Sequence, residues 1–239
     1  TYIDMEHLAY KCAMVAMSNI FAMNGHPRQI VVSIALGKRI NVTNLDQFYV
    51  GLKAACAKWN VDIVGGDTTS SYTGLAINIT CIGEAAKEDI VYRKGAKPTD
   101  IICVSGDLGA AYMGLQLLER EKRVFRGESD FAPDFAGREY LLERQLRPEA
   151  RRDIVESLAS ADLLPTAMID ISDGLASELL HIAARSHVGC RIYEDRLPID
   201  YQTAVMAEEF NMNLAIAALN GGDDHELLDT VSGLEGLHD

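Results

Sequence analysis

The sequence has no long hydrophobic run and no excess of basic residues, and each absence excludes a class of protein. A membrane-spanning helix needs roughly 18 uninterrupted apolar residues, but Lys11, Ser18 and Asn19 interrupt the most apolar stretch, residues 8–23. The chain carries 22 basic and 35 acidic residues, a net charge of −13. Because phosphate backbones are bound by basic surfaces, we expect a protein that binds neither nucleic acid nor a membrane.

The spacing of the five cysteines excludes the common zinc arrangements. Their number is odd, no two are spaced C-x-x-C, and each lies in an apolar context. We therefore predict reduced core residues of a cytoplasmic protein. No secretory signal pattern stands at the start of the chain. The chain opens on Thr1 rather than on Met, which suggests a fragment.

The common nucleotide and hydrolase motifs are missing as well. The chain has no Gly-x-x-x-x-Gly-Lys-Ser/Thr loop, no kinase catalytic loop, no Gly-x-Ser-x-Gly elbow and no Gly-x-Gly-x-x-Gly. The chain is nevertheless long and apolar enough to form a substantial hydrophobic core, because 48% of its 239 residues are hydrophobic. If such a protein handles phosphate, it does so with metal ions and glycine turns.

Both halves of the chain mix helical and strand patterns, which predicts an α+β or α/β fold, and we favour α+β. Residues 92–100 carry Gly, Pro and charge, so we place a domain boundary there, between residues 1–92 and 93–239. Residues 124–135 are predicted to be irregular. We predict helices at residues 5–23, 43–59, 110–121, 136–144, 148–160, 173–186 and 201–210, and strands at residues 29–36, 61–64, 75–84, 101–105, 166–171, 190–193 and 214–218.

The most informative segment is Asp170-Ile-Ser-Asp-Gly, which follows an apolar strand pattern. Residues two apart in an extended segment face the same side, so Asp170 and Ser172 would point together. Asp173 stands where a helix is predicted to begin, and it could instead serve only as the N-cap. Clustered carboxylates repel one another unless a cation offsets their charge. The segment therefore favours a divalent-metal site.

Two further acidic-glycine clusters have the same character. In Gly65-Gly66-Asp67-Thr68, the glycines allow close approach to a ligand and Asp67 could bind Mg²⁺; a tight turn capped by Asp67 is the alternative. Residues 221–226 follow a predicted strand and read Gly-Gly-Asp-Asp-His-Glu. Some of their carboxylates could merely cap a following helix, and His225 could be a metal ligand, a base or a structural residue. In the linker, Arg93 could reach a phosphate or simply be solvated.

Taken in order, these motifs resemble those of bacterial thiamine-monophosphate kinases. The resemblance rests on residues 65–68, 93–98, 170–175 and 221–227, with residues 105–109 and 146–148 in support. The wider superfamily includes aminoimidazole ribonucleotide synthetase, selenophosphate synthetase and a hydrogenase maturation protein. The resemblance implies a two-domain α+β architecture whose N-terminal domain, residues 1–92, binds ATP and Mg²⁺ and pairs in a homodimer.

The resemblance also implies a reaction, transfer of the ATP γ-phosphoryl group to thiamine monophosphate. Such a transfer depends on positioning and charge neutralisation, and its acceptor oxygen is already ionised, so no strong general base is needed. Roles are implied motif by motif for catalysis (Asp170, Asp173), ATP binding (Gly66, Asp67, Arg93, Ser172), Mg²⁺ (Asp67, Asp170, Asp173, Asn19) and substrate (Asp223, Asp224, Glu226).

The chain departs from the family pattern at three points. Asn19 stands where the family usually has Asp, which removes a charge from a metal ligand. Asp223 and His225 stand where the family usually has Glu and Tyr. The family's N-terminal acidic segment and C-terminal aromatic region lie outside this chain. Two alternatives therefore stay open, another ATP-dependent enzyme of the superfamily, such as aminoimidazole ribonucleotide synthetase, and a non-catalytic binding protein.

Overall fold

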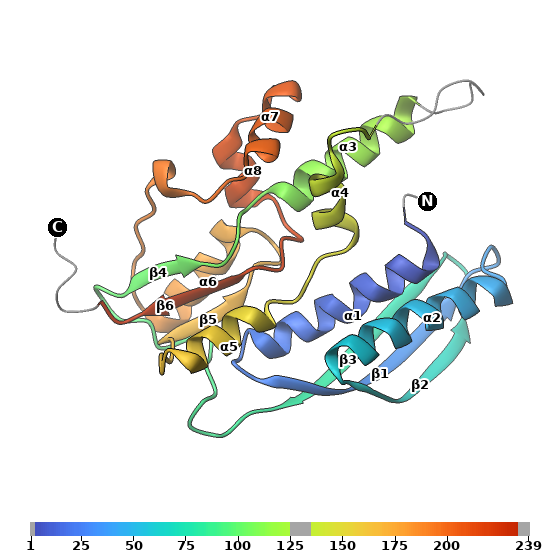
Figure 1. Ribbon diagram of the computed structural model, residues 1–239, viewed down its shortest axis with the longest axis horizontal. Helices are drawn as coiled ribbons and strands as arrows, with labels where there is room; N and C mark the ends of the chain where they lie inside the picture. The colour runs from blue at the N-terminus through green and yellow to red at the C-terminus, as the bar shows by residue number, and fades with distance from the viewer. Residues whose placement is uncertain (1–2, 125–134, 234–239) are drawn as a thin grey trace. The chain divides into compact units, whose positions relative to one another are not determined.

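The computed structural model describes every residue except 1–2, 125–134 and 234–239 (Figure 1). The chain divides into two compact units, Thr1–Ile90 and Val91–Asp239, and each is described by itself. Most of the stretch predicted to be irregular, residues 124–135, lies outside the described residues, and its first residue, Val124, ends a helix.

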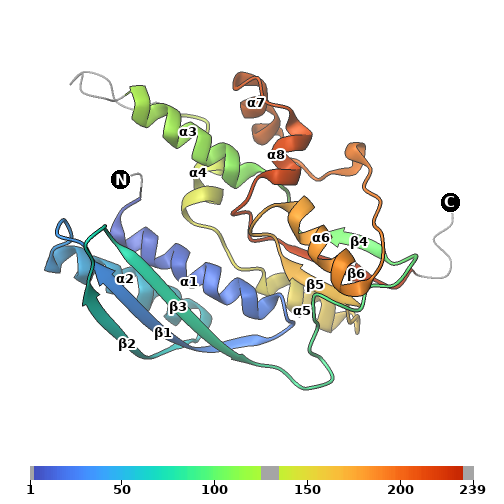
Figure 2. The same cartoon turned by 180° about the vertical axis from the view of Figure 1, so that it is seen from behind.

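In the first unit, two helices cover one face of a three-stranded sheet (Figure 2). The central strand β1 (His26–Leu36) is parallel to β2 (Asp62–Ser70) and antiparallel to β3 (Ala76–Glu84). Alternate residues of β1, namely Ile30, Val32 and Ile34, are buried, as the two-residue period of a strand requires. The helices are α1 (Met5–Phe21) and α2 (Val42–Trp59).

Side-chain caps fix where these two helices begin. The carboxylate of Asp4 accepts a hydrogen bond from the backbone N–H of His7 at 2.8 Å. Asn41 and Asn44 form a reciprocal capping box at the start of α2. Strand β2 runs through Gly65, Gly66 and Asp67 instead of ending at residue 64, so the alternative of a tight turn capped by Asp67 is wrong.

The second unit contains an antiparallel sheet in the order β4-β6-β5. Its strands are β4 (Ile101–Val104), β5 (Ala167–Asp170) and β6 (Leu227–Val231). Helix α6 (Leu175–Ser186) packs on this sheet in an apolar cluster that includes Leu108, Ile169, Leu179 and Leu228. A second cluster joins α3 (Ala110–Val124), α4 (Glu139–Leu146), α7 (Tyr201–Glu209) and α8 (Leu214–Asn220). Helix α5 (Arg152–Ser160) follows α4.

Several predicted elements of this unit are wrong. Residues 214–218 form helix α8 rather than a strand, because Asn213 accepts a hydrogen bond from the N–H of Ile216 at 3.0 Å and caps the segment. Residues 190–193 form no strand, although Glu194–Arg196 makes a short 3₁₀ turn. Strand β6 was not predicted. The helix predicted from Pro148 begins at Arg152, and the one predicted from residue 136 begins at Glu139.

The cysteines match their prediction in part. All five are free, and Cys56 is buried, but Cys190 is exposed, so it is not a core residue. Burial raises the pKa of the Cys56 and Cys81 thiols to about 11. No helix within the described part of the chain is both long and apolar enough to cross a membrane.

Candidate functional site

In the second unit, two of the acidic-glycine motifs lie against each other. Asp170 pairs with Leu227 at the last register position of β5 and β6. The pairing continues beyond the strands through three backbone hydrogen bonds, from the N–H of Ile171 to the carbonyl of Glu226 (2.8 Å), from His225 to Ile171 (2.8 Å) and from Asp223 to Ser172 (2.9 Å). Segments about fifty residues apart therefore form one paired loop structure at this edge of the sheet.

Two glycines make this close approach possible. A Cβ at Gly222 would lie 2.5 Å from the carbonyl oxygen of Ser172, so any side chain there would force the loops apart. Gly174 has a φ of 109°, which L-residues rarely adopt, and its Cβ would meet the backbone of Leu219 and Asn220 at about 3 Å. Close packing of the two loops therefore requires glycine at these two positions, whatever ligand the loops bind.

Asp170, Ser172 and Asp173 differ in exposure. Asp170 is 6% exposed, whereas Ser172 and Asp173 lie at the surface of the unit. The N-cap of α6 is Gly174, which makes no side-chain cap, so the alternative role of Asp173 as N-cap is wrong. The helix begins at Leu175, two residues later than predicted. Asp173 is thus available for another role.

Glu178, in the first turn of α6, belongs to this site although no motif in the sequence marks it. Its carboxylate is 2% exposed and accepts a hydrogen bond from the N–H of Asp173 at 3.1 Å. Burial raises the pKa of Glu178, and the charges of Asp170 and Asp173 raise it further. An acidic residue in the first turn of a helix usually lies at the surface. Only the short spacing between Asp173 and Glu178 could therefore have indicated that Glu178 belongs to the site.

Asp224 has a structural partner. It is 1% exposed and accepts hydrogen bonds from the N–H groups of Gly109 (2.9 Å) and Ala111 (3.4 Å) at the start of α3. Burial raises the pKa of Asp224 to about 7, and these hydrogen bonds and the charge of Arg144 hold back part of that rise. The carboxylate thus closes the N-terminal end of α3, whereas the element after the motif is strand β6, not the helix considered above.

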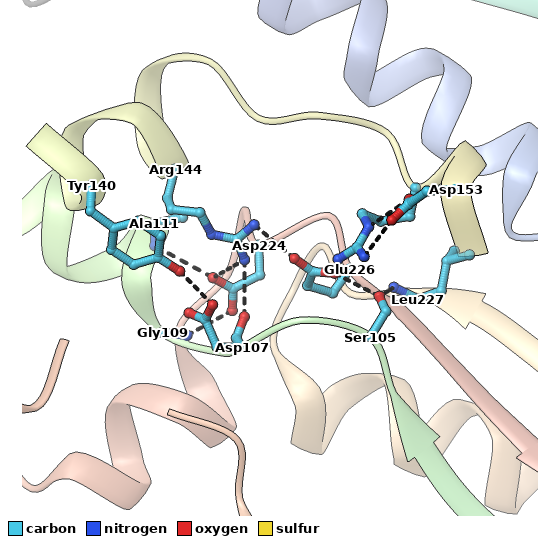
Figure 3. A network of polar contacts seen from close by, with 11 residues as sticks. Ser105, Asp107, Gly109, Ala111, Tyr140, Arg144, Asp153, Asp224, Glu226 and Leu227 are labelled. Atoms are coloured by element: carbon cyan, nitrogen blue, oxygen red, sulfur yellow. Dashed lines mark hydrogen bonds and ion pairs between the residues drawn. The ribbon is translucent and has the colours of Figure 1, made fainter. Parts of the chain in front are cut away.

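Glu226 is the centre of the polar network in Figure 3. Its carboxylate is 1% exposed. It accepts hydrogen bonds from Ser105 Oγ at 2.6 Å and from Arg144 Nη1 at 2.7 Å, and it pairs with Arg151 as well. A Cβ at Gly106 would lie 2.5 Å from this carboxylate. Glu226 therefore joins the end of β4, helix α4 and the start of α5 to the start of β6.

Arg144 links this network to a second carboxylate. Its Nη2 donates to the backbone carbonyl of Asp107 at 2.9 Å, and the hydroxyl of Tyr140 donates to the Asp107 carboxylate. Burial lowers the pKa of Arg144, but the neighbouring carboxylates, Glu226 first, raise it by more. Burial, reinforced by the hydrogen bond to Asp107, raises the pKa of Tyr140. The guanidinium stays charged, and the network is ionic.

Of the three acids predicted to meet the substrate, Asp223 alone presents much of its side chain, which is 45% exposed. Asp224 and Glu226 are each 1% exposed and engaged inside the unit. His225, between them, is 2% exposed. The motif therefore exposes one carboxylate, that of Asp223, and buries the three residues that follow it.

The other predicted residues lie outside these paired loops. Asp67 is exposed on β2, opposite Ser33 of β1, and the amide Nδ2 of Asn19 donates to the carbonyl of Val15 at 3.0 Å within α1. Gly66 packs against the backbone of Val32, since a Cβ there would overlap the Val32 carbonyl. Arg93 is exposed in the segment before β4.

The predicted metal ligands come from both units, Asn19 and Asp67 from the first and Asp170 and Asp173 from the second. Within the described ranges, no group of three or more His, Cys, Asp and Glu side chains is arranged to hold a metal ion. The donors are carboxylate and amide oxygens, the hard ligands that Mg²⁺ prefers, and Asp67 and Asp173 are exposed. In donor chemistry these residues fit Mg²⁺.

Comparison with known proteins identifies the class. Models of the AIR synthase related proteins match residues 1–85 (N-terminal domain) and residues 98–237 (C-terminal domain). Thiamine-monophosphate kinases are among the relatives. The enzyme of Aquifex aeolicus (strain VF5) is 33% identical, and the match covers 94% of this chain and 69% of the relative. The enzyme of Bacillus subtilis (strain 168) is 35% identical, and the match covers 98% of this chain and 68% of the relative. The chain therefore belongs to the AIR synthase related family, in its thiamine-monophosphate kinase branch.

Solved structures agree. AaThiL complexed with AMPPCP and TMP superimposes with a TM-score of 0.83 at 33% identity, over 95% of this chain and 69% of that one. The hydrogenase maturation protein HypE in complex with ATP superimposes with a TM-score of 0.74, over 95% of this chain and 63% of that one. At 19% identity, this match shows the fold alone. These matches confirm the predicted two-domain α+β architecture and favour the kinase branch over the rest of the superfamily.

Proposed function

We propose that this chain is an ATP-dependent kinase that transfers the γ-phosphoryl group of ATP to thiamine monophosphate, giving thiamine diphosphate and ADP. The observation that carries the proposal is the backbone pairing of the two acidic loops, Asp170–Gly174 and Gly221–Glu226. The pairing supports it because the loop with Asp170 and Asp173, which we propose for Mg²⁺, lies against the loop with the exposed Asp223, which we propose for the substrate. The 33–35% identity to thiamine-monophosphate kinases along nearly the whole chain supports it.

Each proposed role has a physical basis. Asp67, Asp170, Asp173 and Asn19 would hold Mg²⁺, which offsets the repulsion between two phosphate-bearing reactants when bound. Ser172, Gly66 and Arg93 would bind and orient ATP. Because the acceptor phosphate is ionised near neutral pH, the transfer needs positioning more than proton abstraction. This fits a site whose ionisable groups are mostly carboxylates and arginines.

Within the Gly221–Glu226 motif, we assign the substrate contact to Asp223. Its carboxylate is the accessible one, whereas Asp224 and Glu226 are held by α3 and by the arginine network. Thiamine carries a positive charge on its thiazolium ring, so an exposed carboxylate suits it. Asp224 and Glu226 would support the loop that presents Asp223.

We further propose that residues 1–92 bind ATP and Mg²⁺ and pair in a homodimer, that residues 93–239 complete the site, and that the protein works in the cytoplasm. In support of pairing, β2 and β3 expose most of their residues in the first unit, and Val64 and Ile82 are about half exposed. Light scattering on the purified chain tests the dimer, and a monomer at micromolar concentration would contradict it.

The decisive test measures ADP formation with Mg·ATP and either thiamine monophosphate or an aminoimidazole ribonucleotide precursor. We expect turnover with the first alone. Asp170→Asn and Asp173→Asn should each reduce turnover by about a hundredfold or more while leaving the unfolding midpoint close to that of the wild type. The matched control is Asp195→Asn, an exposed acid of the same unit that should leave turnover unchanged. Near-normal rates in both site variants would remove these residues from the mechanism.

One observation favours a second candidate, a non-catalytic binding protein. Asn19 carries no charge, and its amide is hydrogen-bonded to Val15 within α1. Calorimetry with Mg·ATP distinguishes the two functions. Tight binding without ADP formation, with turnover restored by Asn19→Asp, would support the binding protein.

A further inference from the structure

His225 is buried in an unusual state. The residue is 2% exposed, and neither ring nitrogen has a hydrogen-bond partner within the described part of the chain. Leaving buried polar atoms unpaired is costly, so each such case calls for a physical explanation. The backbone at His225 has a φ of 53°, and its N–H is fixed to the carbonyl of Ile171. The main chain thus holds the imidazole in place.

The charged group beside this imidazole is Asp223. Nε2 of His225 lies 3.5 Å from Oδ1 of Asp223, and the other carboxylate oxygen, Oδ2, accepts a hydrogen bond from Gln145 Nε2 at 3.4 Å. Well-formed hydrogen bonds between nitrogen and oxygen usually measure about 2.7–3.2 Å, so both contacts of this carboxylate are long. A shift of about half an ångström in the Asp223 side chain would therefore satisfy Nε2. Gln145 and His225 flank the carboxylate.

We infer that His225 is a positioning residue, whose Nε2–H holds the Asp223 carboxylate in the orientation that receives the positively charged part of the thiamine monophosphate. The inference rests on the proposed function. It explains why an imidazole without other partners is buried next to the one exposed acid of the motif. The bond forms as the ligand draws the carboxylate into place, so its energy contributes to substrate binding rather than to the chemical step.

The test compares two substitutions of His225 in the full chain. His225→Phe keeps an aromatic ring but has no donor, whereas His225→Gln can present an amide N–H near the position of Nε2. We expect His225→Phe to raise KM for thiamine monophosphate about tenfold, as the loss of one hydrogen bond to a charged group predicts, with kcat and KM for ATP unchanged. His225→Gln should stay within about threefold of the wild type.

A double-mutant cycle separates positioning from a structural role. In an Asp223→Asn background, His225→Phe should change KM for thiamine monophosphate by less than about twofold, because the partner is already altered. Full additivity of the two substitutions would overturn the inference. So would an equal rise of both KM values with a fall in kcat, which is what loosening of the loop predicts.

A readout independent of activity keeps this inference separate from the proposed function. If the wild type forms no ADP with thiamine monophosphate, the proposed function fails. Nitrogen NMR of the imidazoles then decides the role of His225, whose resonances are assigned by their loss in His225→Phe. Because Oδ1 of Asp223 lies 3.5 Å from Nε2 even without ligand, Asp223→Asn is expected to shift the Nε2 resonance of His225. An unchanged resonance would overturn the pairing.

Discussion

Replacing Glu226 by Gln is the sharpest perturbation of the polar network in Figure 3, because it removes one charge and little volume. The carboxylate is 1% exposed and faces two arginine side chains that are 16% and 19% exposed. Breaking a buried ion pair by neutralising one partner costs about 3–5 kcal/mol. Arg151 keeps its pair with Asp153 at 2.8 Å, and Arg144 keeps the Asp107 carbonyl at 2.9 Å. We therefore expect Glu226→Gln to lower the free energy of unfolding by about 3 kcal/mol, the low end of this range.

For a chain of this size, such a loss lowers the melting temperature by roughly 6–12 °C. The assay is thermal and urea unfolding followed by far-UV circular dichroism. Fluorescence of Trp59, the one tryptophan of the chain, reports on the first unit alone. The transition of the second unit should therefore move in circular dichroism more than the Trp59 signal does.

The matched control is Glu156→Gln, the same chemical change on the surface of α5. Glu156 pairs with Arg152 at 2.6 Å, but the two side chains are 54% and 46% exposed. Exposed pairs contribute at most about 1 kcal/mol, so this variant should melt within a few degrees of the wild type. Equal losses in the two variants would refute the reasoning that burial makes the Glu226 network important.

Three further predictions concern other parts of the chain. A Cβ at Gly66 would overlap the carbonyl of Val32, whereas one at Gly65 meets no atom within 4 Å. In urea titrations, Gly66→Ala should therefore lower the free energy of unfolding by about 1–3 kcal/mol, and Gly65→Ala should lower it by less than about 1 kcal/mol. Equal losses in the two variants would contradict this. Burial raises the pKa of Asp229 from 3.8 to about 6, so its contribution to stability is complete below 3.8 and is lost as pH rises through about 6. Asp229→Asn should accordingly stabilise the fold by about 1–3 kcal/mol at pH 8 and by less at pH 5 in urea titrations, and an equal gain at both would argue against a buried charge. Removing Mg²⁺ with EDTA should abolish ADP formation without changing the circular dichroism spectrum; turnover in excess EDTA would contradict a Mg²⁺ requirement.

The helices of the first unit could be predicted because their signals are local. The helical patterns at residues 5–23 and 43–59 predict α1 and α2, and each observed helix begins within one residue of its prediction. Strand β6 and helix α8 show the limit. Their short apolar runs fit either a strand or a helix. The ladder that makes Leu227–Val231 a strand comes from β4 and β5, which lie more than fifty residues earlier in the chain.

The site shows the same division between local and distant information. The spacing of Asp170, Ser172 and Asp173 could be read from the sequence, as could the acidic-glycine character of residues 221–226. The partners of these residues could not. Glu226 meets Ser105 and Arg144, which lie 121 and 82 positions away. Such contacts follow from the topology of the sheet and leave no periodic signal in the sequence.

The Gly221–Glu226 motif also shows why a motif cannot be read as a set of ligands. A loop that presents one carboxylate, Asp223, at the edge of a sheet must itself be held firmly. Asp224 does this through the N–H groups at the start of α3, and Glu226 does it through two arginines. Conversion of either acid to a neutral residue would reduce activity by displacing the loop, even if neither meets the substrate. Activity loss at Asp224 or Glu226 therefore assigns a substrate contact only where the unfolding midpoint is unchanged, whereas for Asp223 the exposed side chain makes a direct contact the expected cause.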